Sequence, residues 1–265
     1  MERNETASTV DPVLPNAFDL VHLEAADSAL DEALRRARAD ADEGTLVWVD
    51  HPQTPTGRQG RRWLLEADPG LHAALILNPD LPATECAQLG PVAVVALGRA
   101  LAGAVQPMTE LHHRWPNDVL LDGGKVAGVW LRGEGTAARV RTLVIAFAVN
   151  TRAAPESLGF DASSLVHEGV AGDIDPGELL QAIARQLVIQ IETWDEQGFA
   201  PILRSFRGRL ALGGASHIAL ADGTTVAGIA EAVDDHGNLR IRADAGTHEI
   251  ALERFFDLGM QPRDE

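Results

Sequence analysis

The chain has little of two things: cysteine and basic charge. Cys86 is the single cysteine among 265 residues, which excludes a disulfide framework within the chain and a thiolate metal cluster. Acidic side chains number 39 against 22 basic ones, giving a formal net charge of −17. A chain this acidic repels phosphate, so we do not expect it to bind nucleic acid as a whole.

Long apolar runs and several familiar motifs are also lacking. No uninterrupted apolar run approaches the roughly 18 residues of a membrane span, and the first residues show no basic segment followed by an apolar one, so we expect a cytoplasmic protein without a membrane partner. The sequence contains no GxxxxGK[ST], GxGxxG, HExxH or GxSxG motif, and its nine histidines are scattered. We therefore expect no Walker loop, no dinucleotide fingerprint, no hydrolase elbow and no dedicated protein metal site.

The elements that are present predict an α+β protein. We expect a flexible lead-in over residues 1–17, a main domain over 18–207 with a mixed sheet, and a small all-β domain over 208–265. Apolar spacing predicts helices after a Ser28 N-cap, from about 83 to 105, and over 176–197. The second helix would bury Cys86 as a core thiol. The short alternating segments after residue 208 predict a small antiparallel barrel or sandwich.

The loop from Gln53 to Trp63 is the first candidate site. It holds Arg58, Arg61 and Arg62, with glycines that let backbone amides approach a ligand. Guanidinium groups and backbone N–H groups both bind planar anions, so the loop suits a carboxylate or a phosphate. An exposed surface loop remains the alternative.

The second candidate is the stretch HHRWPNDVLLDGGKVAGVW. The run Trp115–Asp118 suits a bend that enters a strand, and the glycines after Asp122 suit a tight hairpin. Lys125 is harder to explain, because it begins an otherwise apolar strand and a buried ammonium group would need a partner. A strand-end lysine that points into water is the alternative.

Together these segments resemble the biotin protein ligases, in the short form without an N-terminal DNA-binding domain. The stretch Gln53–Trp63 resembles the family's QTAGRGRxGRxW signature, Arg114–Asp118 its KWPND motif, and Lys125–Val129 its KxAGI strand. The order of the motifs and the small C-terminal β domain also match. The resemblance extends from about residue 18 to 260, and it predicts a biotin/lipoate-ligase-like catalytic domain followed by an SH3-like β-barrel.

The resemblance implies an ATP-dependent ligase that forms biotinyl-AMP and transfers biotin to a lysine of a biotin carboxyl carrier domain. ATP and Mg²⁺ would be co-substrates, no DNA would be bound, and the protein would be a monomer or a homodimer. Lys125 and Arg58 would be the catalytic residues. The other implied biotin-binding residues are Ser28, Gln53, Thr56, Gly57 and Gly128, and the implied nucleotide-binding residues are Arg61, Trp63, Asn117, Asp118 and Asn150.

The sequence departs from the family pattern in four places. The usual Ser-Thr-Asn is Ser28-Ala29-Leu30, Thr56 takes the place of an arginine in a loop one residue short, Arg114 replaces a lysine, and a GxGxN strand end is Ala146–Asn150. These departures leave two alternatives open. One is a ligase of the same fold for lipoate, octanoate or another small carboxylate; the other is a relative that binds a ligand without turnover.

Overall fold

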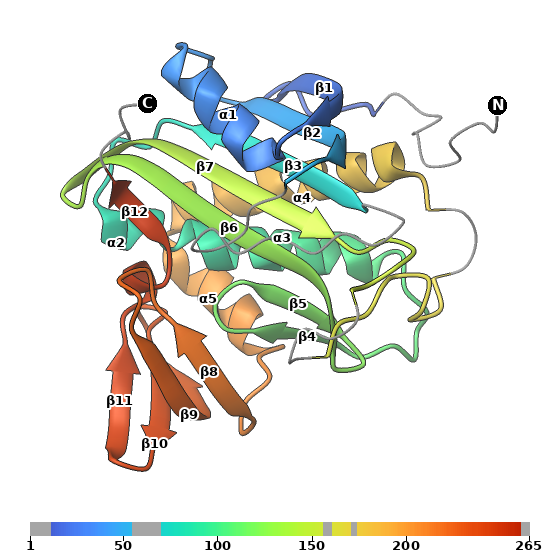
Figure 1. Cartoon of the computed structure of the whole chain (residues 1–265). Helices are drawn as coiled ribbons and strands as arrows, with labels where there is room; N and C mark the ends of the chain where they lie inside the picture. Colours follow the sequence, from blue (N-terminus) through green and yellow to red (C-terminus); the bar gives the residue numbers. More distant parts are fainter. Residues whose placement is uncertain (1–11, 55–69, 156–160, 171–173, 261–265) are drawn as a thin grey trace.

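A large mixed sheet is the central layer of the protein (Figure 1). The computed structural model describes residues 12–54, 70–155, 161–170 and 174–260. The strands of the sheet follow the order β1-β2-β3-β7-β6-β5-β4, and β12 pairs with β6 beside this path. Their bounds are β1 Asp19–Ala26, β2 Thr45–Pro52, β3 Leu71–Leu77, β4 Leu111–Arg114, β5 Asp118–Leu121, β6 Gly124–Thr136, β7 Arg139–Val149 and β12 Asp257–Met260.

Two parallel pairings make the sheet mixed, as the sequence predicts. β1 pairs parallel with β2, β12 pairs parallel with β6, and the other neighbours are antiparallel. The hairpin between β5 and β6 turns through Asp122 (φ 44°) and Gly123 (φ 89°), the pair of positive φ angles that a two-residue hairpin turn requires. The predicted α+β class with a mixed sheet is confirmed.

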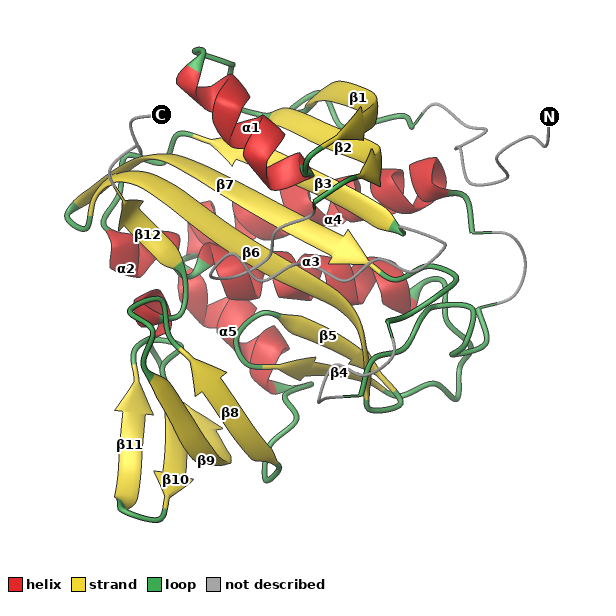
Figure 2. Ribbon diagram, viewed as in Figure 1, coloured by secondary structure: helices red, strands yellow, loops and turns green. Residues whose placement is uncertain are grey.

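Helices cover both faces of the sheet (Figure 2). α1 (Ala29–Arg38) packs on β2, β3 and β7, while α3 (Leu89–Ala102) packs on β4–β7, and α4 (Pro176–Gln197) and α5 (Phe199–Arg207) pack on α3. The expected N-cap of α1 is present, since the Asp31 backbone N–H donates to Ser28 Oγ over 3.0 Å. Its apolar face, with Leu30, Ala33 and Leu34, is buried.

The helix expected from about 83 to 105 is interrupted. Residues 83–86 form the short helix α2 (Ala83–Cys86), and α3 begins at Leu89. Pro91 explains the break, because it has no N–H to donate to the Ala87 carbonyl, which accepts instead from Gly90 over 3.1 Å. Cys86 is fully buried, and burial raises the pKa of its thiol to about 11, as expected for a core thiol.

By length and hydropathy alone, the stretch Ala83–Ala102 is apolar enough to span a membrane. From the sequence we expect no segment long and apolar enough for a membrane span, so this stretch departs from that expectation. However, 72% of its most apolar window is buried inside the protein. The helix fills the space between the sheet and α4 and α5, which accounts for an apolar surface on all sides.

The small C-terminal sheet has four antiparallel strands in the order β11-β10-β9-β8. They are β8 (Ala215–Ala219), β9 (Thr225–Val233), β10 (Leu239–Ala243) and β11 (Gly246–Ile250). Among the described residues β8 and β11 do not pair, so the sheet is open and the expected barrel closure is not confirmed. The chain then returns through a 3₁₀ turn to β12, so the range 208–265 also contains one strand of the large sheet.

An aromatic cluster joins the large sheet to the segment between the 3₁₀ turn and β12. Phe255 and Phe256 pack edge-on at 5.1 Å, Phe255 meets Trp115 at 5.5 Å, and Phe256 lies 5.7 Å from Trp130 of β6. Phe256 also lies against α3, where a Cβ on Gly90 would stand 2.4 Å from its ring. The glycine is therefore needed for the close approach of helix and ring.

We predict that Gly90→Ala lowers the free energy of unfolding by about 1–3 kcal/mol, because a fully buried ring must move to admit the methyl group. Urea denaturation measures the loss. Gly103→Ala, at the exposed end of α3, is the matched control; its nearest contact would be at 3.5 Å, and we expect no loss there. Equal stability of Gly90→Ala and wild type would contradict the packing described for Phe256.

Candidate active site

The strand directions bring the predicted site residues to one end of the large sheet. β1, β2 and β7 all finish at this end, while β3 and β6 start there, since Leu71 is opposite Val149 and Val149 is opposite Ala127. Ser28 and Gln53 follow β1 and β2, Asn150 follows β7, and Lys125 lies at the start of β6. Segments far apart in sequence thus converge at one end of the large sheet.

A buried carboxylate is the centre of this region. Asp118 is 7% exposed. One of its oxygens, Oδ1, lies 2.7 Å from Lys125 Nζ, and the other accepts from Arg114 Nη2 over 2.6 Å and Nε over 3.0 Å. Lys125 is thus neither in open water nor without a partner, and its side chain stays 15% exposed. The arrangement fixes the Lys125 ammonium group at this end of the sheet, where its position is set by one carboxylate oxygen of Asp118.

The charges around Asp118 decide its protonation. Burial by itself raises the pKa of a carboxyl group, but the positive charges of Lys125 and Arg114 outweigh burial, so the pKa of Asp118 is lowered. Both cations therefore face an ionised carboxylate at neutral pH. Arg114, the residue that differs from the family's lysine, supplies a two-pronged contact that a lysine cannot make.

Asn117 holds the turn before Asp118 against β6. Its side-chain Nδ2 donates to the Val129 carbonyl over 2.7 Å, and the Val129 N–H donates to the Asn117 carbonyl over 2.8 Å. In the β5–β6 register Asp118 lies opposite Gly128, which is buried. The WPND segment and the KVAGV strand are therefore one hydrogen-bonded unit.

Asn150 secures a second segment across the start of β6. Its side chain donates to the Ser163 carbonyl over 2.9 Å, and the Leu165 N–H donates to its backbone carbonyl over 3.0 Å. Backbone hydrogen bonds of 2.9 Å also join Lys125 to Asp161 and to Ser163. The side-chain amide of Asn150 thus serves the protein's own framework, and this segment was not foreseen from sequence because it carries no motif.

Ser28 and Gln53 lie where β1 and β2 finish. The Gln53 N–H donates to the Ala26 carbonyl over 2.9 Å, and its side chain is exposed. Ser28 is 3% exposed, and its hydroxyl caps α1 and bonds Asp31. The two positions after Ser28 hold buried apolar side chains, so they offer no polar contact to a ligand.

Part of the predicted site lies outside the described residues. This part comprises Thr56, Gly57, Arg58, Arg61 and Trp63. The described chain enters this segment at the finish of β2 and leaves it at the start of β3, both at the sheet end that carries Lys125.

Phe147 lies near the end of β7, in the stretch Ala146–Asn150 that stands where the family pattern has GxGxN. It is 3% exposed and belongs to the hydrophobic core.

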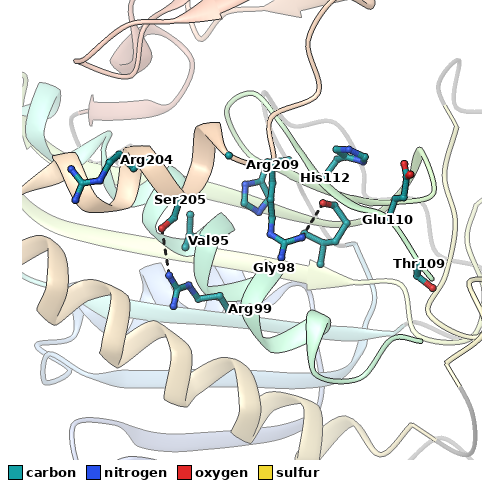
Figure 3. Close-up of a pocket in the computed structure, with 12 residues that line it drawn as sticks. Val95, Gly98, Arg99, Thr109, Glu110, His112, Arg204, Ser205 and Arg209 are labelled. Atoms are coloured by element: carbon teal, nitrogen blue, oxygen red, sulfur yellow. Dashed lines mark hydrogen bonds between the residues drawn. The ribbon is translucent and has the colours of Figure 1, made fainter. Parts of the chain in front are cut away.

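A separate polar cleft of about 800 Å³ lies between α3, β4 and α5 (Figure 3). On its walls Arg99 donates to Ser205 Oγ over 3.4 Å, and Arg209 donates to the Leu111 carbonyl over 3.3 Å. Buried His113 faces Gly98, whose Cβ would lie 2.7 Å from Nε2. Burial lowers the pKa of His113 to about 4, so its ring is neutral at pH 7. The cleft marks the junction of the large sheet with the linker to the small one, residues 208–214 between α5 and β8.

Comparison with known proteins identifies the family. A model of the biotin/lipoate A/B protein ligase family matches residues 58–208. A biotin–[acetyl-CoA-carboxylase] ligase of Paracoccus denitrificans is 37% identical over 205 residues, which cover 76% of this chain and 85% of that protein. The chain belongs to the biotin/lipoate A/B protein ligase family.

Two further similarities agree with this membership. A biotin–[acetyl-CoA-carboxylase] ligase of Mycobacterium tuberculosis is 31% identical over 231 residues, covering 83% of this chain and 81% of that protein. The fold is shared with the biotin protein ligase of Aquifex aeolicus solved with biotin and ATP, at a TM-score of 0.71 and 23% identity, covering 89% of this chain and 97% of that one. The predicted resemblance is thus confirmed at the level of the family.

We predict that Asp118→Asn lowers the free energy of unfolding at pH 7 by about 3 kcal/mol, because it leaves two partly buried cations without their counter-charge. The lowered pKa of Asp118 means that this difference is complete above the unfolded-state pKa of about 4 and shrinks as pH falls through the lower folded-state pKa. Urea denaturation from pH 7 to pH 3 measures it. A constant difference over that range would contradict the ion-pair account.

Proposed function

We propose that the protein is a biotin protein ligase that uses ATP to activate biotin as biotinyl-AMP and transfers it to a carrier-protein lysine. Family membership supports this proposal, and the single observation that carries it is the Lys125–Asp118–Arg114 arrangement at the sheet end. In the first step a biotin carboxylate oxygen attacks the α-phosphorus of ATP and pyrophosphate leaves. In the second, the lysine amine attacks the acyl carbon and AMP leaves.

Lys125 is the residue we assign to charge stabilisation. Negative charge gathers on the carboxylate and the α-phosphate as they react, and a fixed cation there lowers the barrier without reorganising. Asp118 holds the ammonium group in place before substrate arrives. Gly128 would let the substrate approach β6, and Asn117 and Asn150 would shape the site through the segments that they hold.

We assign the segment of Gln53 to Trp63 to the cover of the acyl-adenylate, with Arg58, Arg61, Thr56, Gly57 and Trp63 in contact with biotin or nucleotide. The support is that its two ends leave the sheet at the end that carries Lys125 and that the loop combines arginines with glycines. Covering the site protects a mixed anhydride from water.

Magnesium is expected to enter with ATP. No group of three or more His, Cys, Asp or Glu side chains suited to a metal occurs in the described part of the chain. Mg²⁺ usually binds through substrate phosphates and a few carboxylates, where it neutralises phosphate charge. We assign it no dedicated protein site.

The acceptor we propose is the biotin carboxyl carrier domain of a carboxylase, as the names of the curated relatives suggest. We also propose a cytoplasmic protein, a monomer or homodimer, with a catalytic domain over 18–207 and an SH3-like module after it. The deciding test is mass spectrometry of a carrier domain incubated with the protein, biotin and Mg·ATP. A gain of one biotin per carrier supports the proposal, and an unchanged mass contradicts it.

The absence of polar side chains at Ala29 and Leu30 favours one second candidate, a ligase for lipoate or octanoate. A pyrophosphate-release assay with biotin, lipoate and octanoate separates the two functions. Release with biotin alone supports the first. Release with lipoate or octanoate alone supports the second, and no release with any acid leaves a binding protein without turnover.

We predict that Lys125→Ala lowers the rate of biotinyl-AMP formation roughly 30- to 1,000-fold, because loss of a charge-assisted contact to the reacting group removes about 2–4 kcal/mol of transition-state stabilisation. Arg114 still neutralises Asp118 in this variant, so the protein should stay folded, which circular dichroism checks. Arg141→Ala, on β7 near the far end of the sheet, is the control. A wild-type rate in Lys125→Ala would overturn the assignment.

We predict that Arg58→Gly impairs retention of biotinyl-AMP more than its synthesis. Loss of the guanidinium group loosens the closed loop, and each 1.4 kcal/mol lost from closure speeds escape about tenfold. Adenylate half-life on the enzyme and labelling of added albumin measure the effect. Equal half-lives and equal albumin labelling in wild type and variant would remove Arg58 from the cover.

A further inference from the structure

A hydrogen bond connects the WPND segment to the small C-terminal sheet. Trp115 is 5% exposed, and its indole Nε1 donates to the Gly237 carbonyl over 2.8 Å. Trp115 lies three residues before Asp118, whose carboxylate holds Lys125. A buried indole N–H almost always needs an acceptor, and here the acceptor comes from the turn between β9 and β10.

That turn is built to hold the carbonyl still. Asp234 Oδ1 accepts from the backbone N–H groups of His236 over 2.9 Å and Asn238 over 2.8 Å. Asn238 Oδ1 in turn accepts from the Leu252 N–H over 3.0 Å. Gly237 has φ +88°, and an added Cβ would stand 3.0 Å from Leu252 and 3.1 Å from Phe199. The turn is therefore fixed by its own side chains and by tight packing against α5 and the 3₁₀ turn.

The linker between the sheets also bonds this part of the chain, through the backbone of His113 in β4. The His113 N–H donates to the Arg209 carbonyl over 2.7 Å, and the Ala211 N–H donates to the His113 carbonyl over 2.8 Å. Leu210 thus forms an isolated parallel bridge with His113 of β4, the edge strand that leads directly into Trp115. Backbone bonds at His113 and the indole bond of Trp115 thus both tie the segment before Asp118 to the C-terminal part of the chain.

We propose that the Asp234–Asn238 turn is a positioning element for the ligase site. Its Gly237 carbonyl fixes Trp115, and Trp115 fixes the Asn117–Asp118 bend that orients the Lys125 ammonium group. Trp115 and Asp234 are positioning residues, since they act through Asp118 and not on the substrate. This inference rests on the proposed biotin-ligase function and extends it to a turn 122 residues after Trp115 in sequence.

The test uses the full chain and steady-state biotinyl-AMP formation, with two pairs of variants. Trp115→Phe removes the indole donor but keeps a ring against Phe255; Trp130→Phe, which packs 6.1 Å from the same Phe255, is its control. Asp234→Ala loosens the turn; Asp222→Ala, which removes a similar turn carboxylate between β8 and β9, is its control.

We expect kcat to fall about tenfold in Trp115→Phe and several-fold in Asp234→Ala, with the KM for biotin unchanged, because the loss concerns orientation in the transition state. Both controls should keep kcat within about twofold of wild type, even if their urea midpoints fall as much as those of Trp115→Phe and Asp234→Ala. The Trp115→Phe/Asp234→Ala double variant should be no slower than Trp115→Phe alone, since both changes act on one contact.

Several results would overturn the inference. One is a wild-type kcat in folded Trp115→Phe and Asp234→Ala; another is a loss that follows the drop in stability equally in the controls; a third is multiplicative losses in the double variant. If Trp115→Phe fails to fold, Asp234→Ala against Asp222→Ala decides alone. Failure of the proposed function is a separate outcome, because wild type would then form no biotinyl-AMP at all.

Discussion

The site depends on one buried carboxylate between two cations. Asp118 is ionised because Lys125 and Arg114 outweigh the effect of burial on its pKa, and in return it fixes both of them. An ion pair of this kind adds little net stability compared with an apolar core, but it costs several kcal/mol to break by removing one member. Its consequence is geometric: a cation is held, with 15% of its side chain exposed, at the sheet end where β1, β2 and β7 finish and β3 and β6 begin.

The rest of the fold keeps that arrangement in place through contacts between distant segments. Asn117 bonds β6, Asn150 ties the 161–165 segment across the start of the same strand, and Trp115 bonds the turn of the small sheet. The aromatic cluster around Phe255 and Phe256 then joins Trp115 and β6 to α3. Side chains that a motif marks as functional are thus also structural, since each bonds the backbone of another segment.

Sequence patterns were sufficient to predict those structural features that neighbouring residues determine. The Ser28 cap, the positive φ angles after Leu121 and the apolar periodicity of α1 and α4 depend on neighbouring residues, and the structure has them. The proline break before α3 is local too, but the alanine-rich pattern around it hid the signal. The family motifs pointed to Lys125 and Asp118 through resemblance, without revealing that the two bond each other.

Non-local features could not be predicted in this way. β4 is four residues with three polar side chains, and it is a strand because the linker and β5 pair with it. β12 is defined by parallel pairing with β6, more than 120 residues earlier. Closure of the small sheet was expected from its short alternating segments and from the family resemblance, and alternation does not determine whether the edge strands meet.

The proposed activation of biotin with ATP depends above all on the Lys125–Asp118–Arg114 arrangement. The most direct measurement is biotin-dependent exchange of labelled pyrophosphate into ATP, which reports the first step without any carrier protein. We expect exchange by the wild-type protein with biotin, lost on Lys125→Ala and absent without biotin. No exchange by folded wild type at saturating biotin and Mg·ATP, or undiminished exchange by Lys125→Ala, would contradict it.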